Sequence, residues 1–465
     1  MWSGVIDPHP TSPPILGLGS AFFAEVEAAR FPKAVLRYRN DEAARLVGIK
    51  DLSDEAWTDH FARFAPLPHN LPKPLALAYH GHQFRVYNPD IGDGRGFLFA
   101  QIKGQDSRLY DLGTKGSGTT PFSRSGDGRL TLKGAVREIL ATEMLGALGV
   151  PTSRSFSVIE TGEALMRHDE PSPTRSAVLV RLSHSHIRLG TFQRAAFRGD
   201  KDGLAKLVTY VAENLLPGES IEEAHDLLEV TARRVAKATA RIMAAGFVHG
   251  VLNTDNINVT GEVFDFGPWR FLPELDPAFT AAYFDHGGLY AFGRQPEAVH
   301  WNLAAFADAL MPIADQKKLY AVLEAFPDIY AAAFGDAVLR RLGLEAGSSE
   351  EDTELASDVF SFLARTKLPF EETMFGLHAA HLDGWTGGEK APQDKDSQAL
   401  YERLKARPPE PDAPGPYGHA PESLLIDEVE RLWRSIDEED DWGPLNEKIA
   451  RIRRYRDWAG LSASL

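Results

Sequence analysis

The sequence predicts an α+β protein of two lobes, a strand-rich N-terminal lobe followed by a mainly helical C-terminal lobe. Its 465 residues exceed what one hydrophobic core usually holds. Residues 80–128 are rich in glycine and carry short apolar runs, which is typical of strands joined by tight loops. From about residue 204 onward, apolar residues recur mainly at helical spacing. We therefore expect an N-terminal extension over 1–75, an N-lobe over 76–192 and a C-lobe over 193–465.

The elements of the first half follow in order. A strand over 35–40 and a helix over 41–47 are expected to form a small cap on the N-lobe. The run Phe97–Lys103 predicts a strand, and apolar residues at helical spacing predict a helix over 131–148. Gly149 and Pro151 end that helix. Two further strands are expected over 155–160 and 177–182.

The second half reads as helices around a short loop region. An amphipathic pattern predicts a helix over 225–245 with Gly246 at its end. Longer helices are expected over 301–326 and 351–366. Residues 385–421 are rich in proline, glycine and charge, which favours a mobile loop or linker. A charged helical tail is expected over 422–458.

Composition excludes several classes of function. The formal net charge of −16 disfavours broad binding to nucleic acid or anionic membranes, so an anionic ligand needs a local basic site. The absence of cysteine excludes disulfides, thiolate metal sites and redox control through a disulfide. No secretory signal and no run of about 20 apolar residues is visible. We expect a cytoplasmic enzyme, and no pattern points to a dimer, so a monomer is expected.

The most informative motif is His249-Gly-Val-Leu-Asn-Thr-Asp-Asn256, followed by Asp265-Phe-Gly267. In kinase catalytic loops the third residue is an Asp that acts as base, and an Asn five residues later binds metal. Here the third residue is Val251, whereas Asn256 and Asp265 are hard oxygen ligands suited to Mg²⁺. A carboxylate returns at Asp255, as a base or as a water-mediated metal ligand. His249 is expected to pack and hydrogen-bond within the loop.

Three segments are candidates for binding phosphate. Gly92-Asp-Gly94-Arg95 combines backbone freedom with a forked cation, although a hairpin turn fits it equally well. Residues 115–129 are dense in glycine, hydroxyls and cations but lack the order of a P-loop. Arg181 and Arg188 could clamp a polyphosphate, or could be exposed cations at a strand end. The order of Lys115 and Glu138 matches the Lys–Glu pair of kinases, with Glu143 as a rival to Glu138.

These segments together resemble the selenoprotein O family of protein adenylyltransferases. The matching stretches run in family order and are Tyr79–Phe84, Gly92–Arg95, Lys115–Gly118, Thr120–Arg124, Gly126–Arg129, Arg137–Glu138, His249–Asn256, Asp265–Pro268 and Trp301–Leu303. The resemblance implies a bilobal protein-kinase-like fold with family-specific extensions. It also implies transfer of AMP from ATP to Ser, Thr or Tyr hydroxyls of proteins, with Mg²⁺ or Mn²⁺ as cofactor.

The resemblance also assigns roles to residues. Asp255 would accept the proton, and Asn256 and Asp265 would hold the metal. The ATP contacts would come from Gly92, Gly94, Arg95, Lys115, Asp127, Gly128, Arg181, Arg188 and Asp265. Glu138 would pair with Lys115 or help to hold a metal. Two rivals remain: a kinase that uses Asp255 for γ-phosphoryl transfer, and a silent ATP-binding module that acts through partners.

Overall fold

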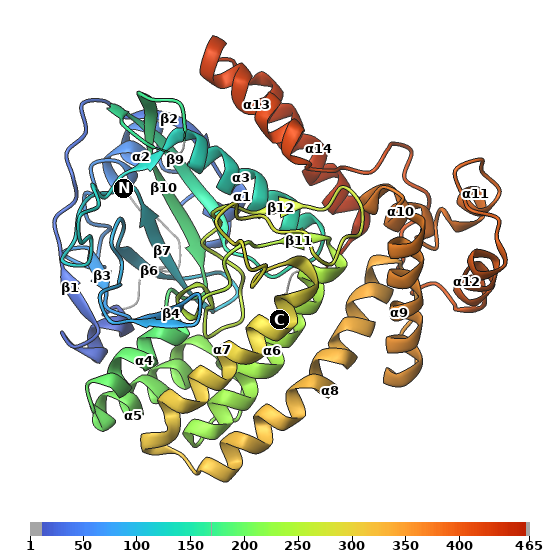
Figure 1. Cartoon of the computed structure of the whole chain (residues 1–465). Coiled ribbons are helices and arrows are strands. Elements are labelled where there is room, and N and C mark those ends of the chain that lie inside the picture. The colour runs from blue at the N-terminus through green and yellow to red at the C-terminus, as the bar shows by residue number, and fades with distance from the viewer. Residues whose placement is uncertain (1–11, 169, 462–465) are drawn as a thin grey trace.

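The computed structural model describes residues 12–168 and 170–461. The start of the expected extension, 1–11, and the end of the expected C-lobe, 462–465, lie outside the described residues. Within them the chain is a mixed α/β protein. Strands dominate up to Ser183 and helices dominate from Leu189. Figure 1 shows the sheet on one side of the molecule, with α6, α7 and α8 packed together below it and α9 to α12 extending to the side.

One antiparallel sheet forms the N-terminal half. Its strand order is β1-β3-β6-β7-β10-β9-β2, with β8 paired to β10. The strands are β1 (Phe23–Glu25), β2 (Val35–Arg39), β3 (Leu75–Leu77), β6 (Leu98–Lys103), β7 (Leu109–Lys115), β8 (Leu130–Thr131), β9 (Arg154–Leu165) and β10 (Thr174–Ser183). The expected N-terminal extension therefore supplies the two edge strands of the sheet, β1 and β2. Its helices, α1 (Asp41–Leu46) and α2 (Asp54–Phe61), pack on the sheet through Trp57, Phe61 and Phe156.

Helix α3 (Leu132–Ala147) lies against the sheet, as its apolar spacing predicts. Thr131 caps its N-terminus by accepting a hydrogen bond from the Gly134 amide. On its outer side it meets α13 (Ile426–Glu439) and α14 (Gly443–Ala459), which Figure 1 shows in red beside it. The C-terminal tail is therefore helical, as expected, but broken at residues 440–442.

The helical half is built on α6 (Ala224–Ala244), whose buried face contacts α7 and α8. The other helices are α4 (Leu189–Phe197), α5 (Lys201–Tyr210), α7 (Gln295–Leu310), α8 (Gln316–Arg341), α9 (Ser349–Thr366), α10 (Phe370–Leu377), α11 (Leu382–Thr386) and α12 (Lys395–Ala406). A short antiparallel pair, β11 (Phe247–Val248) and β12 (Arg270–Phe271), brackets the 249–267 loop region. Among the described residues, no helix combines the length and apolar character needed to cross a membrane.

Two expectations for the helical half are wrong in detail. The expected helix over 301–326 is two helices, because α7 ends at Leu310 and a short 3₁₀ turn containing Pro312 precedes α8. The expected linker over 385–421 contains α12, whose N-terminus is capped by Asp394 and whose Leu400, Tyr401 and Leu404 are buried. Proline and glycine on either side of α12 dominate the composition of 385–421, so the helical spacing of its apolar residues was missed.

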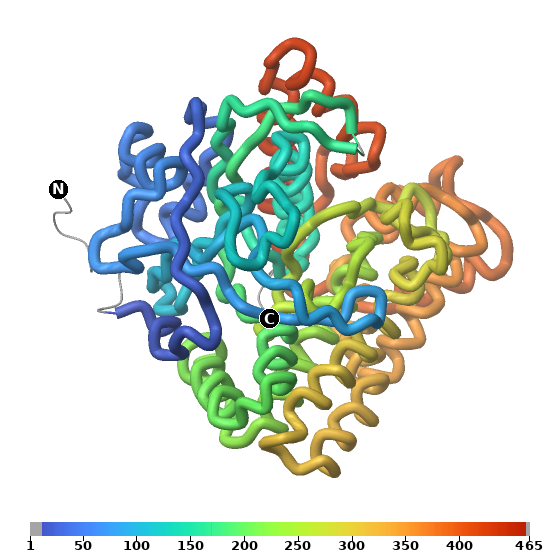
Figure 2. Tube along the Cα trace, turned by 60° about the vertical axis from the view of Figure 1, so that its left-hand side comes forward, coloured from blue at the N-terminus to red at the C-terminus, as the bar shows by residue number. Residues whose placement is uncertain are grey.

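A small hairpin joins the two halves of the chain. Strands β4 (Gly81–Gln83) and β5 (Val86–Asn88) pair with each other and lie off the main sheet. In Figure 2 this blue segment runs across to the helical part of the molecule. It contacts α4 and the 3₁₀ turn Thr254–Asn256, so it delivers N-terminal residues to the loop that follows β11.

Candidate active site

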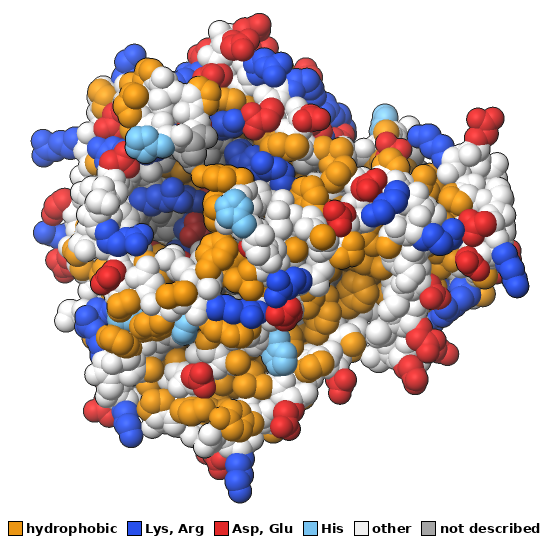
Figure 3. All heavy atoms as spheres, in the orientation of Figure 1, with side chains coloured by type: hydrophobic (Ala, Val, Ile, Leu, Met, Phe, Trp, Pro, Cys, Tyr) orange, Lys and Arg blue, Asp and Glu red, His pale blue; other side chains and the backbone are white. Residues whose placement is uncertain are grey.

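A cavity of about 450 Å³ opens where the ends of β7 and β10 meet the glycine-rich loops and the loop after β11. Figure 3 shows blue side chains gathered in a hollow on this face, in the region of β7 and β10. Seven cationic and four acidic side chains line the cavity, so it suits an anionic ligand. The lining includes ten of the predicted site residues: Gly92, Gly94, Arg95, Lys115, Asp127, Gly128, Arg181, Arg188, Asp255 and Asp265.

Sheet register places two of the cations side by side. Lys115 ends β7 opposite Leu179, and Arg181 follows two residues later on β10, so both side chains leave the same face. Both reach the buried Glu138 on α3, with Lys115 Nζ 2.7 Å from one carboxylate oxygen and an Arg181 nitrogen 3.3 Å from the other. Glu138 thus orients the cations without entering the cavity.

Glu143, the rival to Glu138, serves a different contact. It lies one turn further along α3 and accepts hydrogen bonds from Tyr38 and from Arg453 of α14. Of the two carboxylates, only Glu138 reaches Lys115, so the sequence alternative is resolved in favour of Glu138.

Asp265 is surrounded by cations. Its carboxylate lies 3.0 Å from Lys115 Nζ, 3.2 Å from an Arg181 nitrogen and 3.1 Å from an Arg188 nitrogen. Burial alone raises the pKa of Asp265, but these three cations outweigh burial and hold the pKa well below its usual range. Asp265 also has φ of 63°, the left-handed region that only a firmly held non-glycine residue adopts. The site therefore holds a permanently ionised carboxylate in a fixed position.

Arg188 is fixed by residues that sequence reasoning missed. Its guanidinium carbon stacks 4.4 Å from the Tyr79 ring centre, and one nitrogen donates to the Asp255 carbonyl at 2.8 Å. Another nitrogen lies 3.4 Å from Asp93, whose other carboxylate oxygen accepts a hydrogen bond from the Leu77 amide. Tyr79 and Asp93 both lie in stretches that carry the family resemblance. No local sequence pattern, however, indicates that their side chains contact Arg188.

Asp255 stands in the 3₁₀ turn Thr254–Asn256, on the helical side of the cavity. Its Oδ1 atom is buried and has no hydrogen-bond partner among the described residues, and Oδ2 accepts a long hydrogen bond of 3.5 Å from Gln83. Burial raises the pKa of Asp255 to about 6. A buried carboxylate with a free oxygen can accept a proton from, or coordinate, a group that enters the cavity.

Val251, at the usual position of the base, packs against the hydrophobic core. His249 is buried, and its Nε2 donates to the Phe264 carbonyl at 3.1 Å. This confirms the expectation that His249 packs and hydrogen-bonds within the loop. Neither residue offers a proton acceptor to the cavity, so Asp255 is the basic group that this loop presents there.

The β4–β5 hairpin holds the Asp255 loop in place. The His82 amide donates to Thr254 Oγ1 at 2.7 Å, and the Phe84 amide donates to Asn253 Oδ1 at 3.0 Å. A side chain at Gly81 would lie 3.1 Å from Asp255, a tight contact that glycine avoids. The sequence indicated the hairpin only as a matching stretch and gave no sign that it touches residues about 170 positions away.

The glycine-rich loops form the opposite wall and the rim. Side chains at Gly92 or Gly94 would collide with Phe122, which holds the two loops against each other. Gly128 has φ of 68° and lies against the backbone of Gly118. Asp127 lies on the rim, half exposed, and pairs with Arg167 at 2.8 Å. Sequence reasoning missed Arg167, which comes from the turn after β9.

Asn256 and Asp265 are the residues predicted to hold a divalent cation. The Asn256 amide nitrogen donates to the Val251 carbonyl at 3.0 Å, which leaves its carbonyl oxygen without a partner among the described residues. The structure brings no three His, Asp or Glu side chains of its described part together as a metal site. Mg²⁺ is usually held by one or two protein oxygens together with substrate phosphates. Asp265 lines the cavity, whereas Asn256 is not among its lining residues, so the cavity itself offers a cation that arrives with a polyphosphate one of the two predicted ligands.

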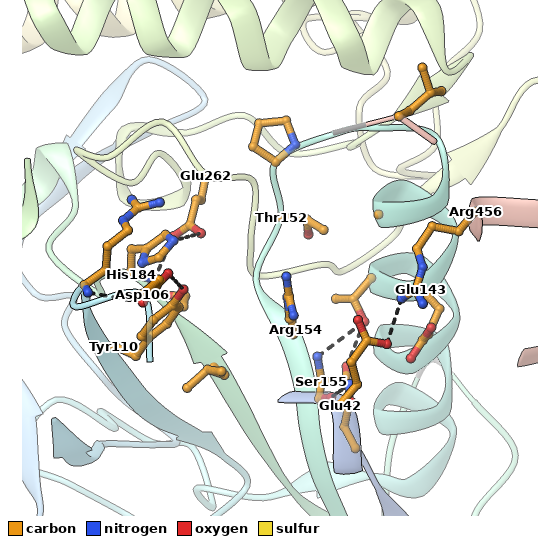
Figure 4. A pocket seen from close by; sticks show the side chains of 18 of the residues that line it. Glu42, Asp106, Tyr110, Glu143, Thr152, Arg154, Ser155, His184, Glu262 and Arg456 are labelled. Atoms are coloured by element: carbon orange, nitrogen blue, oxygen red, sulfur yellow. Dashed lines mark hydrogen bonds and ion pairs between the residues drawn. The ribbon is translucent and has the colours of Figure 1, made fainter. Parts of the chain in front are cut away.

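A second cavity of about 390 Å³ lies at the far end of β7, behind α3, and contains none of the predicted site residues (Figure 4). Several of its charged residues pair with each other or with neighbours, such as Glu42 with Arg456 and Glu143 with Arg453. At its other side, the ring of His184 lies tilted against that of Tyr110. The cation-rich cavity beside Asp255 is therefore the candidate active site.

A polyphosphate-sized basic cavity, a fixed ionised carboxylate and a buried proton acceptor together define a class, the enzymes that transfer part of a nucleoside triphosphate. Comparison with known proteins specifies the family. The family model described as "Protein adenylyltransferase SelO" matches residues 10–407. The chain belongs to this family, and it is a nucleotidyltransferase.

Curated relatives resemble the chain over nearly its whole length, and each is named "Protein nucleotidyltransferase YdiU". The protein of Trichodesmium erythraeum is 39% identical over 95% of this chain and 97% of its own. That of Synechocystis sp. is 40% identical over the same shares. That of Gloeobacter violaceus is 42% identical over 95% of this chain and 94% of its own. The resemblance inferred from the motifs is thus confirmed.

Proposed function

We propose that the enzyme transfers AMP from ATP to Ser, Thr or Tyr hydroxyls of proteins and releases pyrophosphate. The observation that carries this proposal is Asp255, a buried carboxylate whose free oxygen borders the cation-lined cavity. The family description names the adenylyl group as the group that is transferred. The cavity has a carboxylate that can act as the base and cations that can bind the triphosphate.

The proposed reaction forms one bond to the α-phosphorus, breaks another and moves one proton. The hydroxyl oxygen of the protein substrate forms a bond to the α-phosphorus, and the bond from that phosphorus to the bridging oxygen of the β-phosphate breaks. The hydroxyl proton passes to Asp255 Oδ1. A carboxyl group with a pKa of about 6 is ionised at neutral pH, yet is a stronger base than an ordinary Asp.

The leaving pyrophosphate gathers negative charge, and the cations of the cavity are placed to stabilise it. Lys115, Arg181 and Arg188 already converge on one carboxylate, that of Asp265. Asn256 and Asp265 would hold Mg²⁺ or Mn²⁺, which when bound neutralises phosphate oxygens and orients them. The bound nucleotide would be bordered at the rim of the cavity by five residues of the glycine-rich loops: Gly92, Gly94, Arg95, Asp127 and Gly128.

We further propose that the two halves are the lobes of a protein-kinase-like fold. The sheet with α3 would be the N-lobe and the helices from α4 onward the C-lobe, joined by residues 184–188. The Lys115–Glu138 ion pair and the order of the 249–256 and 265–267 loops support this assignment. The boundary at 193 lies within α4, and the 1–75 extension shares the N-lobe sheet.

The test uses ATP labelled separately at the α- and γ-phosphate, with Mg²⁺ or Mn²⁺, beside Asp265→Ala. We expect α-label on protein with release of pyrophosphate, and loss of both in the variant. γ-Label on protein would instead establish a kinase. ATP binding without transfer of either label would establish a silent module, and either result overturns the proposal.

A further inference from the structure

A second hollow of about 370 Å³ adjoins the active site and is strongly basic. Three of its lining residues are arginines, Arg124, Arg194 and Arg198, against a single acid, Asp90. Arg124 also lines the nucleotide cavity, together with Ile91 and Phe122. The two hollows therefore share the wall that these three residues form.

The basic hollow lies close to the proposed base. A side chain at Gly81 would meet Ile91 at 3.0 Å and Asp255 at 3.1 Å, so both residues flank the same point of the hairpin. Ile91 is a wall residue of the basic hollow. The proposed base and one wall residue of the basic hollow therefore meet at the same glycine.

The arginines are poorly neutralised by the protein itself. Arg124 and Arg198 are exposed and make no ion pair or side-chain hydrogen bond within the described part of the chain. Arg194 donates only to the Ala21 carbonyl, which carries no net charge. Burial is the main cause that lowers the pKa of His80 to about 4, and the neighbouring Arg194 and Arg198 lower it further.

This concentration of cations contrasts with the whole chain, whose net charge is −16. An acidic surface repels acidic partners in general, so a local positive hollow selects where such a partner can dock. The half-buried Phe122 adds apolar surface to the hollow, and the exposed Phe197 precedes Arg198 in the chain.

We propose that this hollow, here called the arginine groove and defined by Arg124, Arg194 and Arg198, binds acidic residues that flank the target hydroxyl of the protein substrate. The proposal rests on the proposed function and specifies its substrate class. Carboxylates of the substrate would pair with the arginines while its hydroxyl lies beside Asp255.

The test compares three peptides that share the same Ser, Thr and Tyr and differ only in flanking residues, which are Glu, Gln or Lys. For the wild-type protein we expect kcat/KM to be about tenfold higher for the Glu peptide than for the Gln peptide, and lowest for the Lys peptide. Arg198→Glu leaves two arginines against two acids in the hollow, so it should abolish the preference for the Glu peptide while the KM for ATP stays unchanged.

A matched control separates groove binding from general charge. Lys206→Glu makes the same change of net charge at an exposed position of α5 that does not line the groove, and should preserve the wild-type order. Arg198→Gln leaves two arginines against Asp90, so this milder variant should reduce the preference for the Glu peptide without abolishing it.

Two results would overturn the groove and leave adenylyl transfer standing: equal rates on the three peptides, or an Arg198→Glu effect that appears as a raised KM for ATP with every peptide. The second would assign the arginines to the nucleotide. Absence of label on every peptide and on the enzyme itself would instead refute the proposed function.

Discussion

Two charge networks in this molecule have different balances. Between α8, α10 and α14, Arg341 donates two hydrogen bonds to Glu371 at 2.7 and 2.8 Å, and Tyr455 donates to the same carboxylate at 3.0 Å. In the active-site cavity, seven cations and four acids line the wall, and Glu138 and Glu163 pair with Lys115 and Arg129 from outside the lining. The first network is closed and neutral, whereas the second is open and has excess positive charge.

The difference separates structural from functional charge. Burying ions is costly, so a structural network neutralises itself within the protein, as Arg341 and Glu371 do. An excess of cations is tolerated where an anionic ligand completes the balance. Asp255 shows the same logic for a carboxylate, because its free Oδ1 is buried without a donor. The next variants test whether this contrast holds.

The largest expected effect is that of Asp255→Asn. Removing the base should lower kcat by about 10²- to 10⁴-fold. The folded-state pKa of about 6 lies above the ordinary 3.8, so ionised Asp255 destabilises the fold increasingly as the pH rises from about 4 to about 6, and constantly above that. At pH 7.5 the variant should be more stable than the wild type by up to about 3 kcal/mol. Label transfer and urea unfolding measure the two quantities.

Asp285→Asn is the control for that variant. Asp285 is also buried, but its two oxygens accept hydrogen bonds from the Leu289 and Tyr290 amides. Its carboxylate is thus satisfied by the protein, and its replacement should destabilise the fold. A loss of stability in Asp255→Asn as large as that in Asp285→Asn would show that Asp255 is a structural carboxylate.

The closed network is tested next by Glu371→Gln. The change leaves Arg341 buried beside a neutral partner, so the free energy of unfolding should fall by about 3 kcal/mol. Below the unfolding transition, kcat and KM should stay unchanged, because Glu371 does not line the active-site cavity. Chemical denaturation and label transfer on the same preparation measure both effects.

Glu138→Gln is the matching variant in the open network. Lys115 and Arg181 keep Asp265 as a partner, so the loss of stability should be smaller than in Glu371→Gln. Because Glu138 orients both cations, the stabilisation of the protein by added ATP should decrease. If Glu371→Gln instead lowered kcat and Glu138→Gln lowered only stability, the distinction between the two networks would be wrong.

Sequence patterns predicted what depends on neighbours in the chain. The spacing of apolar residues indicated α3, and the motifs placed Lys115, Asp255 and Asp265 in one site. They did not predict that Gln83 contacts Asp255 or that Arg341, Glu371 and Tyr455 meet, since these contacts join distant segments. The helix α12 was missed because proline and glycine around it dominate the composition of 385–421.

The smallest expected effect concerns Gln83, which orients Asp255 from the hairpin. Gln83 donates to Asp255 Oδ2 at 3.5 Å and accepts from Asn88 at 3.0 Å, so its amide is held from both ends. Its hydrogen bond lowers the pKa of Asp255, although burial is the dominant influence and raises it. In Gln83→Leu the pKa of Asp255 should therefore rise, and the acidic limb of the pH–rate profile should move to higher pH.

At pH 6 the rate of Gln83→Leu should fall by up to about tenfold, and most of that loss should disappear at pH 8.5, where Asp255 is ionised in both proteins. Recovery of the rate at high pH would identify Gln83 as a positioning residue. If the substitution instead unfolded the hairpin, the rate of the enzyme would stay low at every pH. Asn88→Ala removes the outer hydrogen bond alone and should shift the profile in the same direction by less. If the pH–rate profiles of both variants were identical to that of the wild type, burial alone would set the pKa of Asp255. The hydrogen bond from the hairpin would then have no effect on the base.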